Sequence, residues 1–236
     1  MTIAEKLVSI AERLKFVYDA GRENEYNRFW DAFQQNGTRK DYMRSFNGNA
    51  WTAETFTPKY DLKPAWGGGS SMFQSMGFTG SLKAHLNKLG IKLDLSNLLN
   101  CTQLFYMATG ITEFPDLDLR NCINGCTFMF YGCAALTSVK IIISENVSID
   151  TNSFTDCSEL KEIRFEGTLG KSLDLHWSKK LSAESLQNIL DCLSTTSTGQ
   201  TLTLPTTAEA TYDAKHGGGA WAERVNGLTN WEIKYA

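Results

Sequence analysis

The sequence lacks the features that nucleic-acid binding and membrane insertion require. It carries 23 lysine and arginine residues against 26 aspartate and glutamate residues, which gives a formal net charge of -3 at pH 7. No cluster of basic residues interleaves with aromatic ones, so we expect no nucleic-acid partner. No apolar run approaches the roughly 20 residues of a membrane helix, so we expect no membrane insertion.

A secretory signal is also missing from the first residues. In the stretch MTIAEKLVSIAERLKF, charged residues interrupt each apolar pair, whereas a signal needs a continuous apolar stretch. We therefore expect synthesis in the cytoplasm without a signal peptide. The six cysteines could form disulfides, but a chain of this size without an export signal favours thiols. We predict that all six are free.

Catalytic motifs are absent as well. The three histidines, His85, His176 and His216, lie far apart, and none is next to a nucleophile or a second metal ligand. There is no nucleophile elbow, phosphate-binding loop or metalloprotease helix, and the glycine triplets at 67–69 and 217–219 lack the neighbours of a phosphate loop. We predict that the protein is not an enzyme and has no cofactor.

The candidate metal ligands form weak patterns. Cys122 and Cys126 have three intervening residues rather than two, with no second pair or histidine nearby, which argues against zinc. Asp116 and Asp118 supply two carboxylates, fewer oxygen ligands than calcium requires. We predict no metal site.

Apolar residues recur at helical spacing near the N-terminus. A single stripe over residues 2–19 comprises Ile3, Leu7, Ile10, Leu14 and Val17. A second helix is expected after Gly21, and together they predict a helical hairpin. The stripe also fits about two and a half heptads, so it either packs within the chain or mediates self-association as a homo-oligomer. Aromatic residues without a clear period follow, and we expect this linker to dock through them. We predict a helical module and aromatic linker over 1–69 and a second domain over 70–236.

Four segments from residue 72 onward align on a phenylalanine. The segments are MFQSMGFTGSL, LFYMATGITEFPDLDL, MFYGCAALTSVKII and SFTDCSELKEIRFEG, and the aligned residues are Phe73, Phe105, Phe130 and Phe154. Their separations are 32, 25 and 24 residues, and an alternating strand ends three of the four units. A period in the twenties with one short strand per unit predicts a leucine-rich-repeat solenoid. Further on, Ser182 is expected to cap a helix, and a strand at 231–235 closes the sheet.

The units NCTQLFYM, FMFYGCAALTSVKI and NSFTDCSELKEIRFEG resemble the BspA-like class of bacterial leucine-rich repeats, over about residues 72–205. The opening segment resembles the N-terminal module of repeat proteins encoded in phages and prophages of gut Firmicutes. These resemblances imply an α/β solenoid with a BspA-like parallel sheet and an N-terminal helical module.

The resemblance also implies a function. It points to a non-enzymatic, virion- or tail-associated structural or host-binding protein, whose partners are sister subunits, tail components or a host-surface glycan or protein. The alternative is a bacterial leucine-rich-repeat interaction module or surface adhesin. Adhesins of this class carry signal peptides and long repeat arrays, and this sequence shows neither, which favours the phage protein.

The repeat strands predict the candidate interaction surface. Alternation places one row of polar side chains outward, namely Asp118, Lys140, Arg164, Asp174, Thr203 and Lys234. This row is either a solvated, salt-bridged face or a rigid surface that binds a protein or glycan. Nearby candidates for anchors are Tyr106, Tyr131, His176 and Trp177. We also expect Phe130 to stack on Phe154, and the thiols of Cys133 and Cys157 to be buried and to satisfy turn carbonyls.

Overall fold

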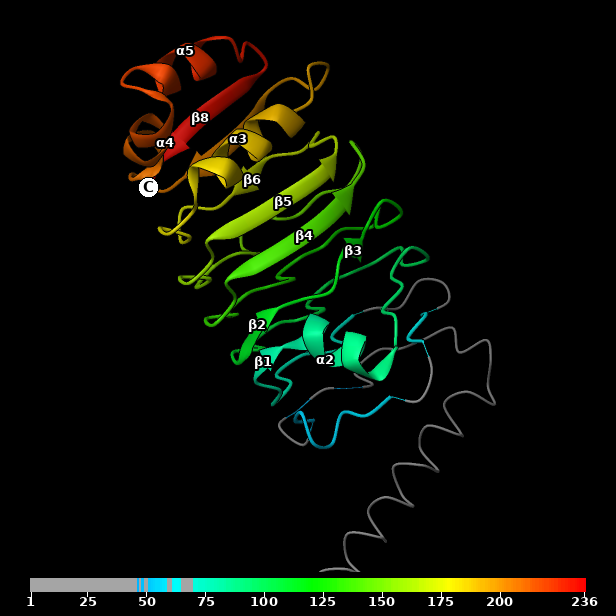
Figure 1. Cartoon of the computed structure of the whole chain (residues 1–236). Helices are drawn as coiled ribbons and strands as arrows, with labels where there is room; N and C mark the ends of the chain where they lie inside the picture. Colours follow the sequence, from blue (N-terminus) through cyan, green and yellow to red (C-terminus); the bar gives the residue numbers. More distant parts are fainter. Residues whose placement is uncertain (1–45, 47, 49–50, 59–60, 65–69) are drawn as a thin grey trace, which may run out of the picture. The chain divides into compact units, whose positions relative to one another are not determined.

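The computed structural model describes residues 46, 48, 51–58, 61–64 and 70–236 (Figure 1). Its contacts divide the chain into two units, Met1–Arg39 and Lys40–Ala236. The first unit contains the predicted helix over 2–19 and its apolar stripe, and it lies outside the described residues. The second unit is an α/β fold with parallel sheets.

The first sheet is built from five parallel strands. They are β1 (Gly80–Ser81), β2 (Ile111–Glu113), β3 (Leu117–Asp118), β4 (Ser138–Ile143) and β5 (Glu162–Gly167). Helix α2 (Leu82–Leu89) follows β1 directly, and the Ser81 side chain caps it by accepting from the N–H of Ala84 at 3.0 Å. β2 and β3 both pair with β4, so together they act as one interrupted strand.

The interruption is a β-bulge. Glu113 is opposite Ser138 and Leu117 is opposite Ile141, so the segment between β2 and β3 holds one residue more than β4 does. Pro115 lies in this segment. Because proline has no backbone N–H, it is tolerated here, between the paired stretches, without the loss of a hydrogen bond of the sheet.

The second sheet has three parallel strands and three neighbouring helices. The strands are β6 (Leu173–Asp174), β7 (Gln200–Leu204) and β8 (Trp231–Tyr235), and the helices are α3 (Ala183–Cys192), α4 (Ala208–His216) and α5 (Ala220–Asn226). The predicted cap of α3 is confirmed, because Ser182 Oγ accepts from the N–H of Ser185 at 3.2 Å. The predicted C-terminal strand is confirmed as β8.

Helix α3 covers the edge of β5 that β4 leaves open. The N–H of Ile163 donates to Ser185 Oγ at 3.0 Å, and the N–H of Phe165 donates to Asn188 Oδ1 at 2.7 Å. Asn188 Nδ2 in turn donates to the carbonyl of Phe165 at 3.1 Å. Side chains of a helix therefore replace the backbone groups of a sixth strand, and the first sheet ends here.

The expected alternation along the strands is confirmed by burial. In β4, Val139, Ile141 and Ile143 are buried, while the residues between them are partly exposed. In β5, Ile163 and Phe165 are buried and Arg164 is exposed. One face of the first sheet thus packs on the core and the other faces outward.

A second backbone ladder runs through the aligned phenylalanines. The N–H of Phe73 donates to Leu104 O at 2.9 Å, that of Phe105 to Met129 O at 2.9 Å, and that of Phe130 to Ser153 O at 3.0 Å. The rings stack in the same order, with centroid distances of 5.2 Å for Phe73–Phe105, 5.7 Å for Phe105–Phe130 and 5.1 Å for Phe130–Phe154. The predicted contact between Phe130 and Phe154 is confirmed.

The same backbone conformation recurs beside each ring. Two residues after each aligned phenylalanine, φ is positive, at Ser75 (52°), Met107 (57°), Gly132 (72°) and Asp156 (60°). Non-glycine residues rarely adopt this conformation. Ladder hydrogen bonds hold it at Ser75 and Met107, whose N–H groups donate to Tyr106 O and Tyr131 O, each at 2.7 Å.

The segment assigned above to a linker contributes to the core. Phe46, Phe56 and Leu62 are at most 1% exposed, and Phe46 stacks on Phe73 with a centroid distance of 5.3 Å. Leu62 forms a parallel bridge with Leu93. These residues add one further turn of chain that packs against Phe73. The boundary between the two units therefore falls between Arg39 and Lys40 and not after residue 69.

The cysteines follow the prediction in part. The thiols of Cys133 and Cys157 are buried and donate to the carbonyls of Phe105 and Phe130 at 3.2 Å each, as expected. The prediction of six free thiols is wrong, because Cys101 and Cys122 form a disulfide across a Cα–Cα distance of 6.4 Å. Residues 21 apart in sequence meet because successive turns of the chain lie side by side.

Candidate interaction surface

The predicted row of outward-facing residues divides into three separate groups in the structure. Lys140 is the direct partner of Arg164 in the pairing of β4 with β5, but Asp118 is opposite Ile142, two residues further along β4. A shift of two residues keeps a side chain on the same face and changes its neighbour. Asp174 lies in the second sheet, where it pairs with Thr203 and, through it, with Lys234.

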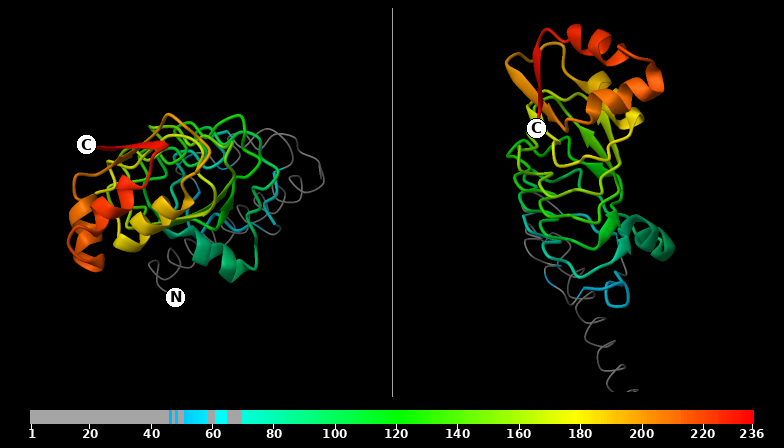
Figure 2. Two further views of the ribbon diagram at one scale, coloured as in Figure 1. Left: turned by 90° about the horizontal axis from the view of Figure 1, so that it is seen from above. Right: turned by 90° about the vertical axis from the view of Figure 1, so that its left-hand side faces the viewer.

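Two cavities open along the outward face of the first sheet. Figures 1 and 2 show α2 at one end of this face and α3 and α4 at the other, projecting to the same side. One cavity of about 230 Å³ has Lys83 of α2 and Lys140 in its wall. The other, of about 340 Å³, lies against α3 and the end of α4. Both cavities have Glu162, Ile163 and Arg164 in their walls, so this part of β5 lies between them.

Lysines around the smaller cavity are neutralised by acidic neighbours. Lys140 Nζ lies 3.1 Å from Asp116 and 3.0 Å from Glu166. These contacts, the hydrogen bond with Glu166 foremost, raise the pKa of Lys140 above its ordinary value. Lys83 Nζ lies 3.4 Å from Glu113 and 3.2 Å from Asp116. In the larger cavity, Lys215 pairs with Glu184.

Arg164 differs from these lysines. Within the described ranges it forms no side-chain hydrogen bond and no ion pair, although its strand partner Lys140 is also a cation. Like charges directly opposite each other on neighbouring strands are unfavourable. Asp116 and Glu166 offset the charge of Lys140, which leaves the exposed guanidinium of Arg164 available to an anionic group.

Three of the predicted site residues meet at the end of β6. Asp174 Oδ1 accepts from the backbone N–H of His176 at 3.0 Å and lies 2.6 Å from its Nδ1. The ring of His176 lies 5.0 Å from that of Trp177, which is 41% exposed. In the part of the chain that the structure describes, no serine, threonine or cysteine side chain bonds to His176, so this pair lacks the nucleophile of a hydrolase.

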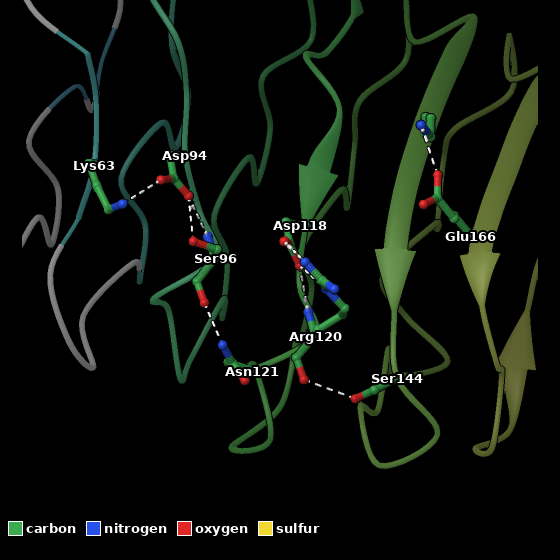
Figure 3. A network of polar contacts seen from close by, with 9 residues as sticks. Lys63, Asp94, Ser96, Asp118, Arg120, Asn121, Ser144 and Glu166 are labelled. Atoms are coloured by element: carbon green, nitrogen blue, oxygen red, sulfur yellow. Dashed lines mark hydrogen bonds and ion pairs between the residues drawn. The ribbon is translucent and has the colours of Figure 1, made fainter.

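Asp118 occupies the same kind of turn and is not available to a ligand. Arg120 donates from Nε to Asp118 Oδ1 at 3.0 Å and from Nη2 to Oδ2 at 2.6 Å, as Figure 3 shows. This hydrogen bonding is the main cause of the lowered pKa of Asp118. The same figure shows Asp94 accepting from Ser96. Asp94, Asp118 and Asp174 each stand in the middle of a Leu-Asp-Leu triplet.

Tyr131 belongs to the ladder of phenylalanines and not to a sheet. Its ring stacks on Tyr106 with a centroid distance of 5.1 Å, and Phe128 meets both rings edge-on. It lines neither of the two cavities at Arg164. The structure therefore does not bring Tyr131 together with Lys140 and Arg164 in these cavities.

Among the described residues, no helix has the length and apolar character needed to cross a membrane. Comparisons of the chain with protein-family models, with curated proteins and with solved structures find no match.

Proposed function

We propose that this protein is a non-enzymatic binding module on a leucine-rich-repeat solenoid of the BspA-like kind. Three features recur together at intervals of 32, 25 and 24 residues: a buried phenylalanine, a residue with positive φ, and a backbone hydrogen bond to the next turn. This recurrence supports a structural repeat. A repeat that buries its apolar face only against its neighbours leaves a continuous outward surface for a partner.

The observation that carries the proposal is Arg164 on the shared wall of two cavities. Six consecutive residue pairs join β4 and β5, so the guanidinium stands on a rigid support. Its planar group binds a carboxylate through two parallel hydrogen bonds, and it is less strongly hydrated than a lysine ammonium. We infer that an anionic group of a protein or glycan binds at Arg164.

The biological setting of the proposal follows from the sequence resemblance. It favours a phage-encoded protein that is associated with the virion or tail and contacts a host-surface molecule or a neighbouring subunit. Tail, lysin or holin genes beside the coding gene are expected for such a protein, and their absence would favour the bacterial adhesin.

The binding test is a charge reversal at one arginine with another arginine as control. Arg164→Glu should weaken binding to cells of the source bacterium, or to arrayed glycans and surface proteins, at least about tenfold, the range of a lost charge-assisted pair. Arg120→Ala removes an exposed arginine that is already paired with Asp118 and should leave binding unchanged. Equal binding by Arg164→Glu and the wild-type chain, at matched melting temperatures, would exclude this surface.

A further inference from the structure

Three cysteine sulfurs converge in the core away from the proposed binding surface. The Sγ atoms of Cys101, Cys122 and Cys126 all lie within 4.8 Å of one another, and all three residues are fully buried. Cys101 and Cys122 form the disulfide, and Cys126 is a free thiol. The cluster forms because the N–H of Cys101 donates to Gly125 O at 3.1 Å, which places one turn beside the next.

Within this cluster, Cys126 differs from the cysteines that serve packing, whereas Cys122 Sγ lies 3.2 Å from the carbonyl of Leu98. The thiols of Cys133 and Cys157 each donate to a backbone carbonyl. In the described part of the chain, the thiol of Cys126 has no hydrogen bond, and the two sulfurs of Cys101 and Cys122 are its neighbours. A buried thiol that faces two further sulfurs is placed as a metal ligand would be.

The sulfur geometry suits a three-coordinate thiophilic ion. Metal–thiolate bonds are about 2.3 Å long, which puts the sulfurs of a trigonal site roughly 4 Å apart. The three sulfurs lie within 4.8 Å of one another, and breaking the bond between Cys101 and Cys122 frees their two sulfurs to take up that separation. Among the described residues, no histidine, carboxylate or fourth cysteine joins the group, whereas structural zinc takes four protein ligands.

We propose that the reduced protein binds one Cu(I) ion through Cys101, Cys122 and Cys126. Soft thiolate ligands select Cu(I), and Cu(I) accepts three-coordinate sites. A small-molecule thiol first reduces the disulfide: two thiol molecules lose two electrons and two protons and become their own disulfide, and Cys101 and Cys122 become thiols. Cu(I) then replaces thiol protons, which pass to solvent, and the copper keeps its oxidation state.

The test uses the full chain, reduced under anaerobic conditions and then freed of reductant. Alkylation after denaturation should first count six thiols. Cu(I) supplied as its bicinchoninate complex should then transfer to the protein as one equivalent, and X-ray absorption should find three sulfur neighbours at about 2.3 Å.

Variants separate the cluster from the remaining thiols. Cys126→Ala, or Cys126→Ser if the alanine chain does not fold, should lose the bound equivalent. Cys157→Ala removes an equally buried thiol outside the cluster and should retain it. The proposal is overturned if the reduced wild-type chain takes no copper from the chelator, or if Cys126→Ser retains the bound equivalent.

Discussion

Phe154 ends a stack of rings that have no exposed surface. It contacts Phe130 at a centroid distance of 5.1 Å, and the next ring along is Phe105. Phe154→Ala should lower the free energy of unfolding by about 3–5 kcal/mol, because it removes buried apolar surface and leaves a cavity between rigid backbone turns. Guanidinium denaturation measures this change.

A matched aromatic control is Trp177→Ala, since Trp177 is 41% exposed and packs on His176 alone among the described rings. Its effect should stay below about 1 kcal/mol, as is usual for surface substitutions. If the two variants unfold at the same denaturant concentration, Phe154 does not contribute to the core as the stack suggests.

The chemistry of individual side chains was predictable where one residue type decided it. The stacking of Phe130 on Phe154 and the thiol–carbonyl bonds of Cys133 and Cys157 followed from equivalent positions in aligned segments. The disulfide did not, because Cys101 and Cys122 hold different positions in their turns. Arg164 could be placed on the outer face, but its lack of an ion pair depends on which strands lie beside it.

At the scale of elements, α3 stabilises the first sheet through Ser185 and Asn188, and Asn188 makes two bonds to one residue of β5. Asn188 accepts from the N–H of Phe165 and donates to its carbonyl. Asn188→Ala should cost about 1–3 kcal/mol, because the N–H of Phe165 loses its partner and its carbonyl keeps only the thiol of Cys192 at 3.5 Å. Chemical denaturation measures the loss, and amide hydrogen exchange at Phe165 should accelerate.

Two further variants test whether the bond between Asn188 and β5 causes this loss of stability. Asn188→Asp keeps the acceptor for the N–H and places a carboxylate against the carbonyl, so it should also destabilise the protein. Glu184→Ala lies on the same helix and removes an exposed ion pair with Lys215, which should cost less than about 1 kcal/mol. A loss at Glu184 equal to that at Asn188 would mean that helix α3 as a whole, and not its bond to β5, is affected.

The sequence predicted strands where β3 to β8 lie and the cap of α3, but it did not predict β1, β2 or the helices α2, α4 and α5. Alternation identifies which side of β4 and β5 is buried, because it depends on local spacing. Asp118 lies opposite Ile142, two residues beyond Lys140 on β4, and the bulge between β2 and β3 contributes one residue to its register, which the spacing between aligned segments cannot show. The division into two sheets likewise depends on Asn188 covering β5, a long-range contact.

For the whole molecule, the main difference from the sequence interpretation is where the second unit begins. The aromatic segment before residue 70 was not aligned with the later units, although Phe46 precedes Phe73 by 27 residues, which is within the spacing of the later rings. Phe46 nevertheless covers Phe73 as each later ring covers the next. A chain shortened to Ser70 would expose Phe73, so Lys40 is the appropriate start for a shortened chain.

At the scale of the whole molecule, the sequence leaves two alternatives for the N-terminal apolar stripe: packing within its own chain, or self-association between chains. The stripe Ile3, Leu7, Ile10, Leu14 and Val17 lies outside the described residues, and burial of each such side chain is worth about 1.5–3 kcal/mol. We expect it to associate between chains, which would display several copies of the surface at Arg164 and increase avidity.

Light scattering should therefore give a multiple of the chain mass for the full protein and a single chain mass for residues 40–236. Ile10→Asp should convert the full protein to a monomer, because a charge in the stripe is costly to bury. Ser9→Asp introduces the same charge one position off the stripe and should leave the assembly intact, since adjacent residues of a helix point about 100° apart. A full-length chain that is already monomeric would instead mean that the stripe packs within its own chain, and each molecule would then present a single copy of the surface.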